Sequence, residues 1–138
     1  MKIILVLDDD NGMMFNKRRQ SQDIAVREKI AEIIEENKLW MNSYSGKQFR
    51  EMEINFCVDE EFLLKAEQGD YCFVENTGIL AVAEQIEEFI LFKWNRRYPG
   101  DFKPDLLPQD MGFTCVEREE FQGYSHEKIT REVWRREE

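Results

Sequence analysis

The chain opens with a hydrophobic run that ends abruptly in acidic residues, and this feature constrains the fold more than any other. Residues 3–7 are all aliphatic, and the run Asp8-Asp9-Asp10-Asn11-Gly12 follows at once. A short apolar run without polar alternation is typical of a strand that is buried on both faces of a sheet. In α/β proteins, ligands bind beyond the carboxyl ends of such strands. Residues 8–23 are therefore the first candidate for a functional site.

The length and composition fit one domain that spans residues 1–138. The 138 residues are 42% hydrophobic, which is enough to fill a core, and there is no internal repeat or Ser/Gly-rich linker. No apolar stretch approaches the roughly 18 residues of a membrane span. The first residues also lack the regions of a secretory signal peptide. We therefore expect a cytoplasmic protein without a membrane partner.

The net charge and the few possible zinc-ligating residues argue against two further classes of protein, those that bind nucleic acid and those that bind zinc. The net charge of −10 opposes bulk nucleic-acid binding, which depends on neutralising phosphates. The three cysteines do not form a CxxC pair, and the chain has a single histidine, His126. A zinc site of the usual ligand type is not expected. We predict no resident metal and no cofactor.

Periodicity predicts alternating strands and helices. Short runs rich in branched and aromatic residues predict strands at 2–7, 38–42, 53–58, 71–75, 88–94 and 113–119. Apolar residues at helical spacing predict helices at 23–36, 59–67 and 78–86. This alternation favours a largely parallel sheet that is covered by helices.

The C-terminal segment breaks the pattern. Residues 127–134 place Ile129 and Val133 four apart, which suits a helix capped by Ser125, but the same two residues also share one face of a strand. Turn-forming residues separate this segment from the strand at 113–119. We favour an antiparallel hairpin over the helix.

Six stretches along the chain carry a family resemblance by their order. They are Ile3–Asp8 with Asn11-Gly12-Met13, Asp23–Val26, Leu39-Trp40-Met41, Tyr71–Val74, Ile90–Lys93 with Gly100-Asp101, and Phe113–Trp134. This series resembles dihydrofolate reductase over nearly the whole chain. The resemblance implies an α/β fold of three layers, in which a mixed sheet carries helices on both faces and ends in an antiparallel hairpin.

The groups by which the family binds its dinucleotide are missing. Where the family has a Gly-Arg-x-Thr turn, this chain has Asn42-Ser43-Tyr44-Ser45, and Glu75-Asn76 replaces the paired glycines. Pyrophosphate binding requires close backbone approach and positive charge, so a glutamate and the loss of the arginine both oppose it. Without its dinucleotide a reductase has no hydride source. The resemblance therefore implies a member of the fold that is not a reductase.

The substrate side is altered as well. Asp23 stands where the family's carboxylate meets its substrate, but the threonine that partners this carboxylate falls near Phe92, which cannot form a hydrogen bond. Asp23 also precedes a predicted helix, where aspartate is a common N-cap. A capping role and a ligand-binding role both remain open. His126 follows Ser125, but adjacency alone does not make a nucleophile–base pair.

The candidate site gathers charged and aromatic residues. We expect a small anionic or planar ligand, or a protein partner, near the 8–23 loop, where Arg18, Arg19, Asp23 and Trp94 should border one concavity. An indole and guanidinium groups that follow one strand suit stacking on a planar group. The predicted ligand-binding residues are Asp8, Asn16, Arg18, Arg19, Asp23, Trp94 and Arg96.

Two further functions fit parts of the sequence. Asp8, Asp10 and Asp23 offer hard oxygen ligands, so a hydrolase of phosphoesters that depends on a divalent metal is the alternative. The acidic balance also suits a protein that blocks a basic partner. Whether the chain is an enzyme stays open at this point.

The first prediction concerns NADPH. Because Asn42–Ser45 and Glu75 replace the phosphate-binding groups, we expect no saturable binding at micromolar NADPH. Fluorescence or calorimetric titration measures this directly. Saturation in that range would restore the reductase interpretation.

Overall fold

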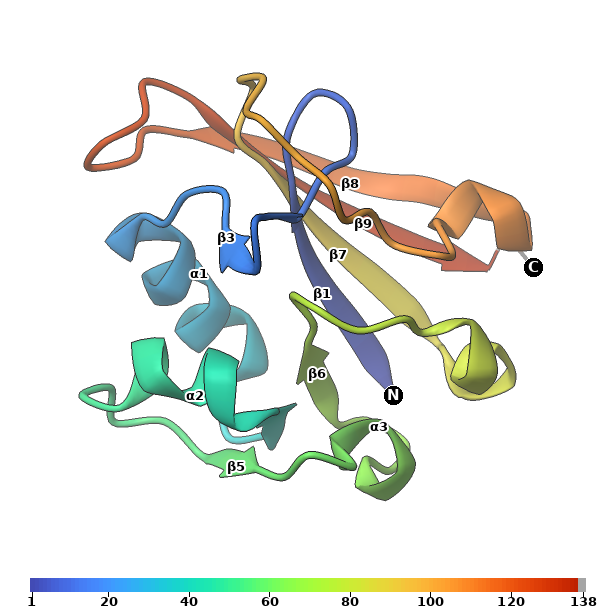
Figure 1. Cartoon of the computed structure of the whole chain (residues 1–138). Helices are drawn as coiled ribbons and strands as arrows, with labels where there is room; N and C mark the ends of the chain where they lie inside the picture. The colour runs from blue at the N-terminus through green and yellow to red at the C-terminus, as the bar shows by residue number, and fades with distance from the viewer. Residues whose placement is uncertain (137–138) are drawn as a thin grey trace.

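A seven-stranded sheet forms the centre of the computed structural model, which describes residues 1–136 (Figure 1). The strand order is β5-β4-β6-β1-β7-β9-β8. In chain order these strands are β1 (Lys2–Leu7), β4 (Leu39–Met41), β5 (Phe56–Val58), β6 (Tyr71–Phe73), β7 (Glu88–Lys93), β8 (Phe113–Phe121) and β9 (Ile129–Arg136). A separate two-stranded hairpin joins β2 (Met14–Phe15) and β3 (Arg18–Arg19).

The sheet is mixed, as predicted. β1 lies between β6 and β7 and is parallel to both, and β4 and β5 continue the parallel part. β9 runs antiparallel to β7, and β8 runs antiparallel to β9. The C-terminal hairpin is therefore confirmed, and residues 129–136 form a strand rather than the alternative helix.

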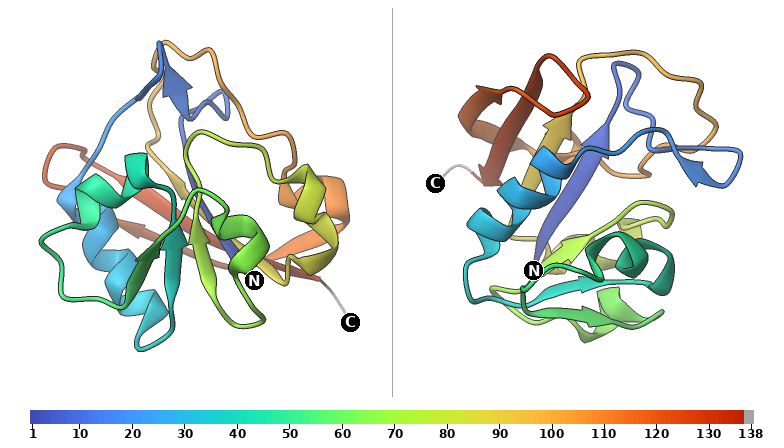
Figure 2. Two further views of the ribbon diagram at one scale, coloured as in Figure 1. Left: turned by 60° about the horizontal axis from the view of Figure 1, so that its bottom comes forward. Right: turned by 90° about the vertical axis from the view of Figure 1, so that its left-hand side faces the viewer.

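Helices cover both faces of the sheet, so the expected three layers are present (Figure 2). Successive side chains of a strand point to opposite faces. Ile4 of β1 therefore packs with α1 (Ile24–Ile34) and α2 (Ser43–Phe49). Ile3 and Leu5 face the other side. There they pack with α3 (Phe62–Lys65) and the 3₁₀ helix η1 (Leu80–Gln85). Met111 of the 3₁₀ helix η2 (Pro108–Met111) packs against the same cluster.

The helix α2 lies in a segment for which the sequence predicted neither a helix nor a strand. The Asn42 side chain accepts a hydrogen bond from Ser45 N at 3.0 Å and caps the helix. Gly46 lets the helix approach β5, because a Cβ at that position would lie 2.8 Å from Val58 Cγ2. Two predicted helices are shorter than expected, since 59–67 forms only α3 and 78–86 forms only η1. Local capping and packing decide these elements more than periodicity does.

The strand β8 is one edge of the sheet. Within residues 1–136 its nine residues pair only with β9, and the register shifts at a bulge between Cys115 and Glu117. The middle of the strand, residues 116–120, is mostly exposed and mostly charged. Within residues 1–136, no helix has the length and apolar character that spanning a membrane requires.

The second prediction tests the packing of α1. Ile30 is 0% exposed beneath the sheet, whereas Ile24 on the same helix is 52% exposed. Ile30→Ala should lower the free energy of unfolding by about 2–5 kcal/mol, because it leaves a cavity in a packed core. Ile24→Ala should cost less than about 1 kcal/mol. Urea denaturation compares the two variants, and equal losses would contradict this packing.

Candidate functional site

Asp8 organises the loop that follows β1. Its carboxylate accepts hydrogen bonds from the backbone N–H groups of Asp10 at 2.9 Å, Gly12 at 2.7 Å and Tyr98 at 3.1 Å. Gln20 Nε2 donates a fourth at 3.1 Å. Burial alone would raise the pKa of Asp8, but these donors outweigh it and lower the pKa below its usual range. Asp8 thus joins the loop after β1 to the segment after β7.

The hairpin of β2 and β3 projects from this loop. Its turn residues Asn16 and Lys17 have φ of 52° and 64°, a left-handed conformation that asparagine tolerates better than most residues. Asn16 N donates to Asp101 Oδ2 at 3.0 Å, which ties the hairpin to the segment after β7. Arg18, the first residue of β3 after this turn, is exposed.

A hollow of about 420 Å³ lies between this hairpin and the segment after β7. We call it the hairpin hollow. Its lining residues are Phe15, Asn16, Arg18, Arg19, Gln20, Tyr98 and Pro99. Three predicted site residues, Asn16, Arg18 and Arg19, therefore share one concavity.

Arg19 binds a buried carboxylate of its own chain. Its Nε and Nη2 atoms donate to the two oxygens of Glu75 at 2.8 and 3.1 Å, and its guanidinium stacks on Tyr44 with a centroid distance of 4.6 Å. Ser45 Oγ and Gln48 Nε2 also donate to Glu75, at 2.7 and 3.1 Å. Burial lowers the pKa of Arg19, but Glu75 outweighs this and raises it. Arg19 is therefore held by the protein itself.

Asp23 is the most heavily bonded carboxylate of the site. One oxygen accepts from Ala25 N at 2.9 Å and Tyr124 N at 3.0 Å, so the predicted N-cap is confirmed. The other accepts from Ser125 N and from His126 Nδ1, both at 2.9 Å, and from Ser125 Oγ at 3.1 Å. Burial favours the neutral acid, but these donors outweigh it and hold the pKa of Asp23 far below its usual range.

His126 connects Asp23 to two hydroxyl groups. Beyond its bond to Asp23, its Nε2 lies 3.0 Å from Ser21 Oγ and 2.9 Å from Tyr98 Oη. The ring stacks on Trp94, with centroids 4.3 Å apart and an interplanar angle of 20°. Sequence reasoning missed Ser21 and gave His126 no role, because 105 residues separate the two. The only local signal was the placement of Ser21 just before a capped helix.

The expected concavity is divided in the structure. Arg18 and Arg19 line the hairpin hollow, whereas Asp23 and Trp94 line a separate cavity of about 20 Å³. Arg96 lines a third hollow, of about 620 Å³, in which Trp94 also takes part. The guanidinium of Arg96 lies 5.7 Å from the ring centroid of Tyr98. His126 is the link between the first two cavities, because it contacts residues of both.

The three aspartates proposed as metal ligands have separate partners. Asp8 binds backbone amides, Asp10 pairs with Arg97 at 3.1 Å, and Asp23 binds the segment 124–126. Residues 1–136 hold no group of three His, Cys, Asp or Glu side chains that is arranged to bind a metal ion.

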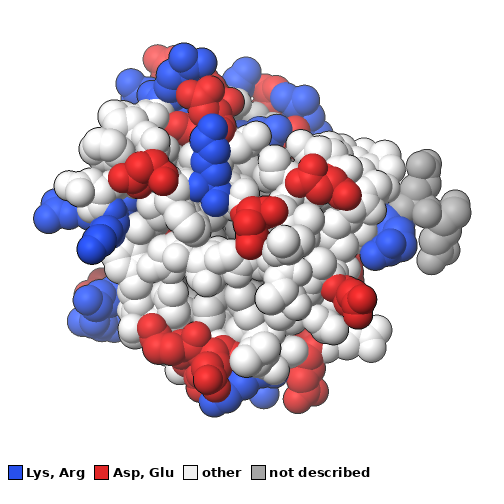
Figure 3. Space-filling model, turned by 45° about the vertical axis from the view of Figure 1, so that its right-hand side comes forward, with Lys and Arg blue, Asp and Glu red and all other residues white. Residues whose placement is uncertain are grey.

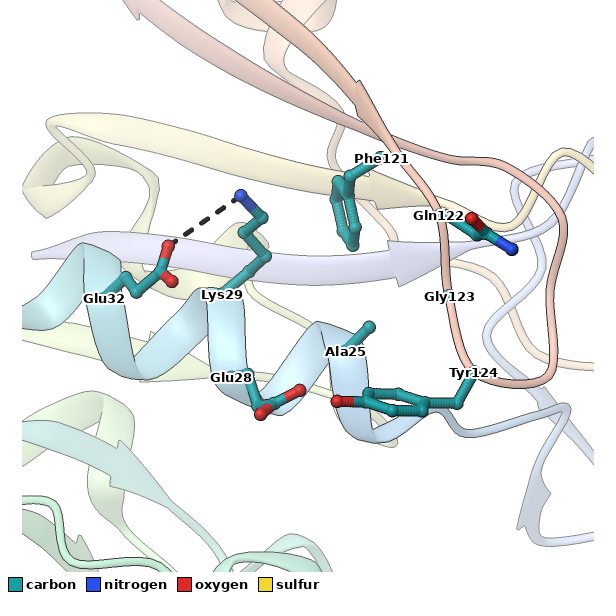
Figure 4. Close-up of a pocket in the computed structure, with 8 residues that line it drawn as sticks. All are labelled: Ala25, Glu28, Lys29, Glu32, Phe121, Gln122, Gly123 and Tyr124. Carbon is teal, nitrogen blue, oxygen red and sulfur yellow. Dashed lines mark ion pairs between the residues drawn. The ribbon is translucent and has the colours of Figure 1, made fainter.

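A further hollow, of about 590 Å³, lies between α1 and the loop that joins β8 to β9 (Figure 4). Its lysine is already paired, since Lys29 lies 3.8 Å from Glu32 and 2.8 Å from Glu119. Lys29 is therefore not available to an anion in this hollow. On the face drawn in Figure 3, charges of both signs are scattered around a broad uncharged centre.

A comparison with solved structures identifies the fold. A dihydrofolate reductase from Enterococcus faecalis, complexed with NADP(H) and RAB-propyl, matches with a TM-score of 0.68 over 99% of this chain and 96% of that chain. The chain has the dihydrofolate reductase fold. Sequence identity to that structure is 11%, so the dihydrofolate reductase likeness covers the arrangement of elements alone. No family model and no curated protein matches the sequence.

The third prediction concerns the pH dependence of stability. The pKa of Asp23 is lower in the folded protein than in the unfolded chain, where it is about 3.9. Its stabilisation is therefore complete above about pH 5 and is lost as the pH falls below about 4. Asp23→Asn places an amide N–H₂ against backbone N–H donors. The substitution should therefore lower the free energy of unfolding by about 2–4 kcal/mol at pH 7.

At pH 3 the same substitution should cost clearly less, because the wild-type carboxylate is then losing its advantage. Urea unfolding at both pH values measures the difference. An equal cost at pH 3 and pH 7 would contradict the charged state assigned to Asp23.

Proposed function

We propose that this protein is a non-reductase of the dihydrofolate reductase fold that binds a small anion with a planar part in the hairpin hollow. The observation that carries the proposal is the exposed guanidinium of Arg18 at this hollow. No carboxylate pairs with Arg18 within residues 1–136, whereas Arg19 is bound by Glu75 and Arg97 by Asp10. An unpaired guanidinium beside a concavity suits a carboxylate or phosphate, which it binds through two parallel hydrogen bonds.

The other walls of the hairpin hollow favour a planar group. Phe15 is 47% exposed there, and Tyr98 lines the opposite side. Aromatic rings that border a cavity supply apolar contact and stacking for a flat ligand. The volume of about 420 Å³ lies in the range of sites for small molecules. These dimensions favour a small molecule over a protein partner.

Two carboxylates support the non-reductase part of the proposal. Glu75 stands where the resemblance places the family's paired glycines, and its charge faces Arg19, Ser45 and Gln48. Glu60 accepts a hydrogen bond from Ser43 N at 2.8 Å at the start of α2. The amide that a phosphate would use there already has an anionic partner. A dinucleotide would have to displace or approach these carboxylates, which costs electrostatic free energy.

The fourth prediction tests this anion site with phenyl phosphate as the probe. Arg18→Ala should weaken its binding about 10- to 100-fold, because it removes a charge-assisted hydrogen bond of about 1.5–3 kcal/mol. Arg50→Ala is the matched control, since Arg50 is an exposed arginine at the end of α2. Isothermal calorimetry gives both dissociation constants, and both variants should keep the wild-type melting temperature.

Inorganic phosphate should bind more weakly than phenyl phosphate if the rings of Phe15 and Tyr98 contribute. Equal loss of affinity in the Arg18 and Arg50 variants would show general charge attraction and remove the basis for the site. No binding of phenyl phosphate at millimolar concentration would do the same.

A further inference from the structure

A serine, a histidine and an aspartate lie in line beside the hairpin hollow. Ser21 Oγ is 3.0 Å from His126 Nε2, and His126 Nδ1 is 2.9 Å from Asp23 Oδ2. We infer that Ser21 is a nucleophile activated by His126 and Asp23, and that the protein hydrolyses small carboxylic esters. The inference stands apart from the anion site, because it depends on Ser21 and not on Arg18.

The bond to Asp23 fixes which ring nitrogen carries the proton in the neutral imidazole. Asp23 is ionised and can only accept, so the proton between the two side chains sits on His126 Nδ1. In the neutral imidazole Nε2 then carries a lone pair that can accept from the Ser21 hydroxyl. This is the tautomer that a general base requires. The side chains of Asp23 and His126 are 0% and 3% exposed, and the stacked Trp94 limits rotation of the ring.

The backbone is shaped for this arrangement at Gly123. A Cβ at that position would lie 2.5 Å from Asp23 Oδ2 and 2.8 Å from Ile129 Cδ1. Only glycine allows the chain to pass so close to the carboxylate. The loop can therefore bring the amides of Tyr124 and Ser125 and the ring of His126 onto Asp23 together.

The surroundings of Ser21 indicate the kind of substrate. Ser21 is partly exposed and lines the cavity of about 20 Å³, which has room for about one water-sized group. Arg27 lines the same cavity, and its Nη1 atom is buried without a hydrogen-bond partner in the part of the chain that the structure describes. A cationic donor beside a nucleophile stabilises a developing oxyanion. The small volume favours a short acyl group such as acetyl.

The reaction is ordinary acyl transfer with water as the co-reactant. Ser21 Oγ forms a bond to the carbonyl carbon as its proton passes to His126 Nε2, and the bond to the alcohol oxygen then breaks. The departing alkoxide takes that proton from Nε2. Water next attacks the acyl-serine, with its proton passing to Nε2, and the acid leaves as Ser21 Oγ regains a proton. One ester and one water give one carboxylic acid and one alcohol.

Tyr98 supplies a readout that a purely structural network would lack. Its hydroxyl lies 2.9 Å from the same Nε2 atom, so it competes with Ser21 for one lone pair. Tyr98→Phe removes the competitor and leaves the bond to Ser21. This variant should react faster at Ser21, whereas a network that serves stability alone gives no such gain.

A fluorophosphonate probe and p-nitrophenyl acetate test the proposal on the full chain. We expect the probe to label the wild-type protein once, with the label on Ser21 by peptide mass spectrometry. Ser21→Ala should abolish labelling and lower kcat/KM for the acetate ester at least about 100-fold. Tyr98→Phe should label two- to fivefold faster. Ser43→Ala is the control serine, exposed on α2, and should match the wild type.

Asp23 and His126 also hold the fold, so their variants are not the primary test. Ser21→Ala removes one partly exposed hydroxyl, and an unchanged melting temperature shows that it is folded. Label on another residue, no label at all, or an ester rate within twofold of wild type in Ser21→Ala would each overturn the proposal. The p-nitrophenyl ester of octanoate tests the preference for a short acyl group. A kcat/KM for this ester equal to that for the acetate ester would contradict that preference.

Discussion

The buried carboxylate of Asp23 holds the functional end of the molecule together. A charge without solvent contact is costly unless donors surround it, and these donors come from the start of α1 and from residues 124–126. If the loop between β8 and β9 moved away, the charge would lose most of its partners. The loop, the helix start and His126 therefore behave as one unit, and Tyr98 joins it through the imidazole.

Most of the sheet could be predicted because its central strands are buried on both faces. The runs at 2–7 and 88–94 have few polar residues, and they form β1 and β7 almost to the residue. Sequence patterns did not predict the elements whose formation depends on individual capping and packing contacts. Residues 43–49 contain serines and a glycine, which are weak helix formers, yet the Asn42 cap and the approach to β5 allowed by Gly46 make them α2.

The site was predicted only in part, because its geometry depends on long-range contacts. The sequence indicated the loop at 8–23 from its position after a buried strand, and it identified Asp23 as a helix cap. It could not show that Glu75 would engage Arg19, or that Arg18 would have no carboxylate partner among residues 1–136. It also could not bring Ser21 to His126, since the turn after β8 sets that distance and no local pattern encodes it.

The edge strand β8 has a consequence for how the protein behaves at high concentration. An unpaired strand edge is a template on which a second chain can add its own strand. Here that edge is long, but Glu117, Arg118, Glu119 and Glu120 place charges along it, and the bulge after Cys115 interrupts its regular spacing. An incoming strand would meet mismatched hydrogen-bond positions and a mostly negative row. The charges and the bulge therefore oppose fibril formation along the edge of the hairpin that also carries His126.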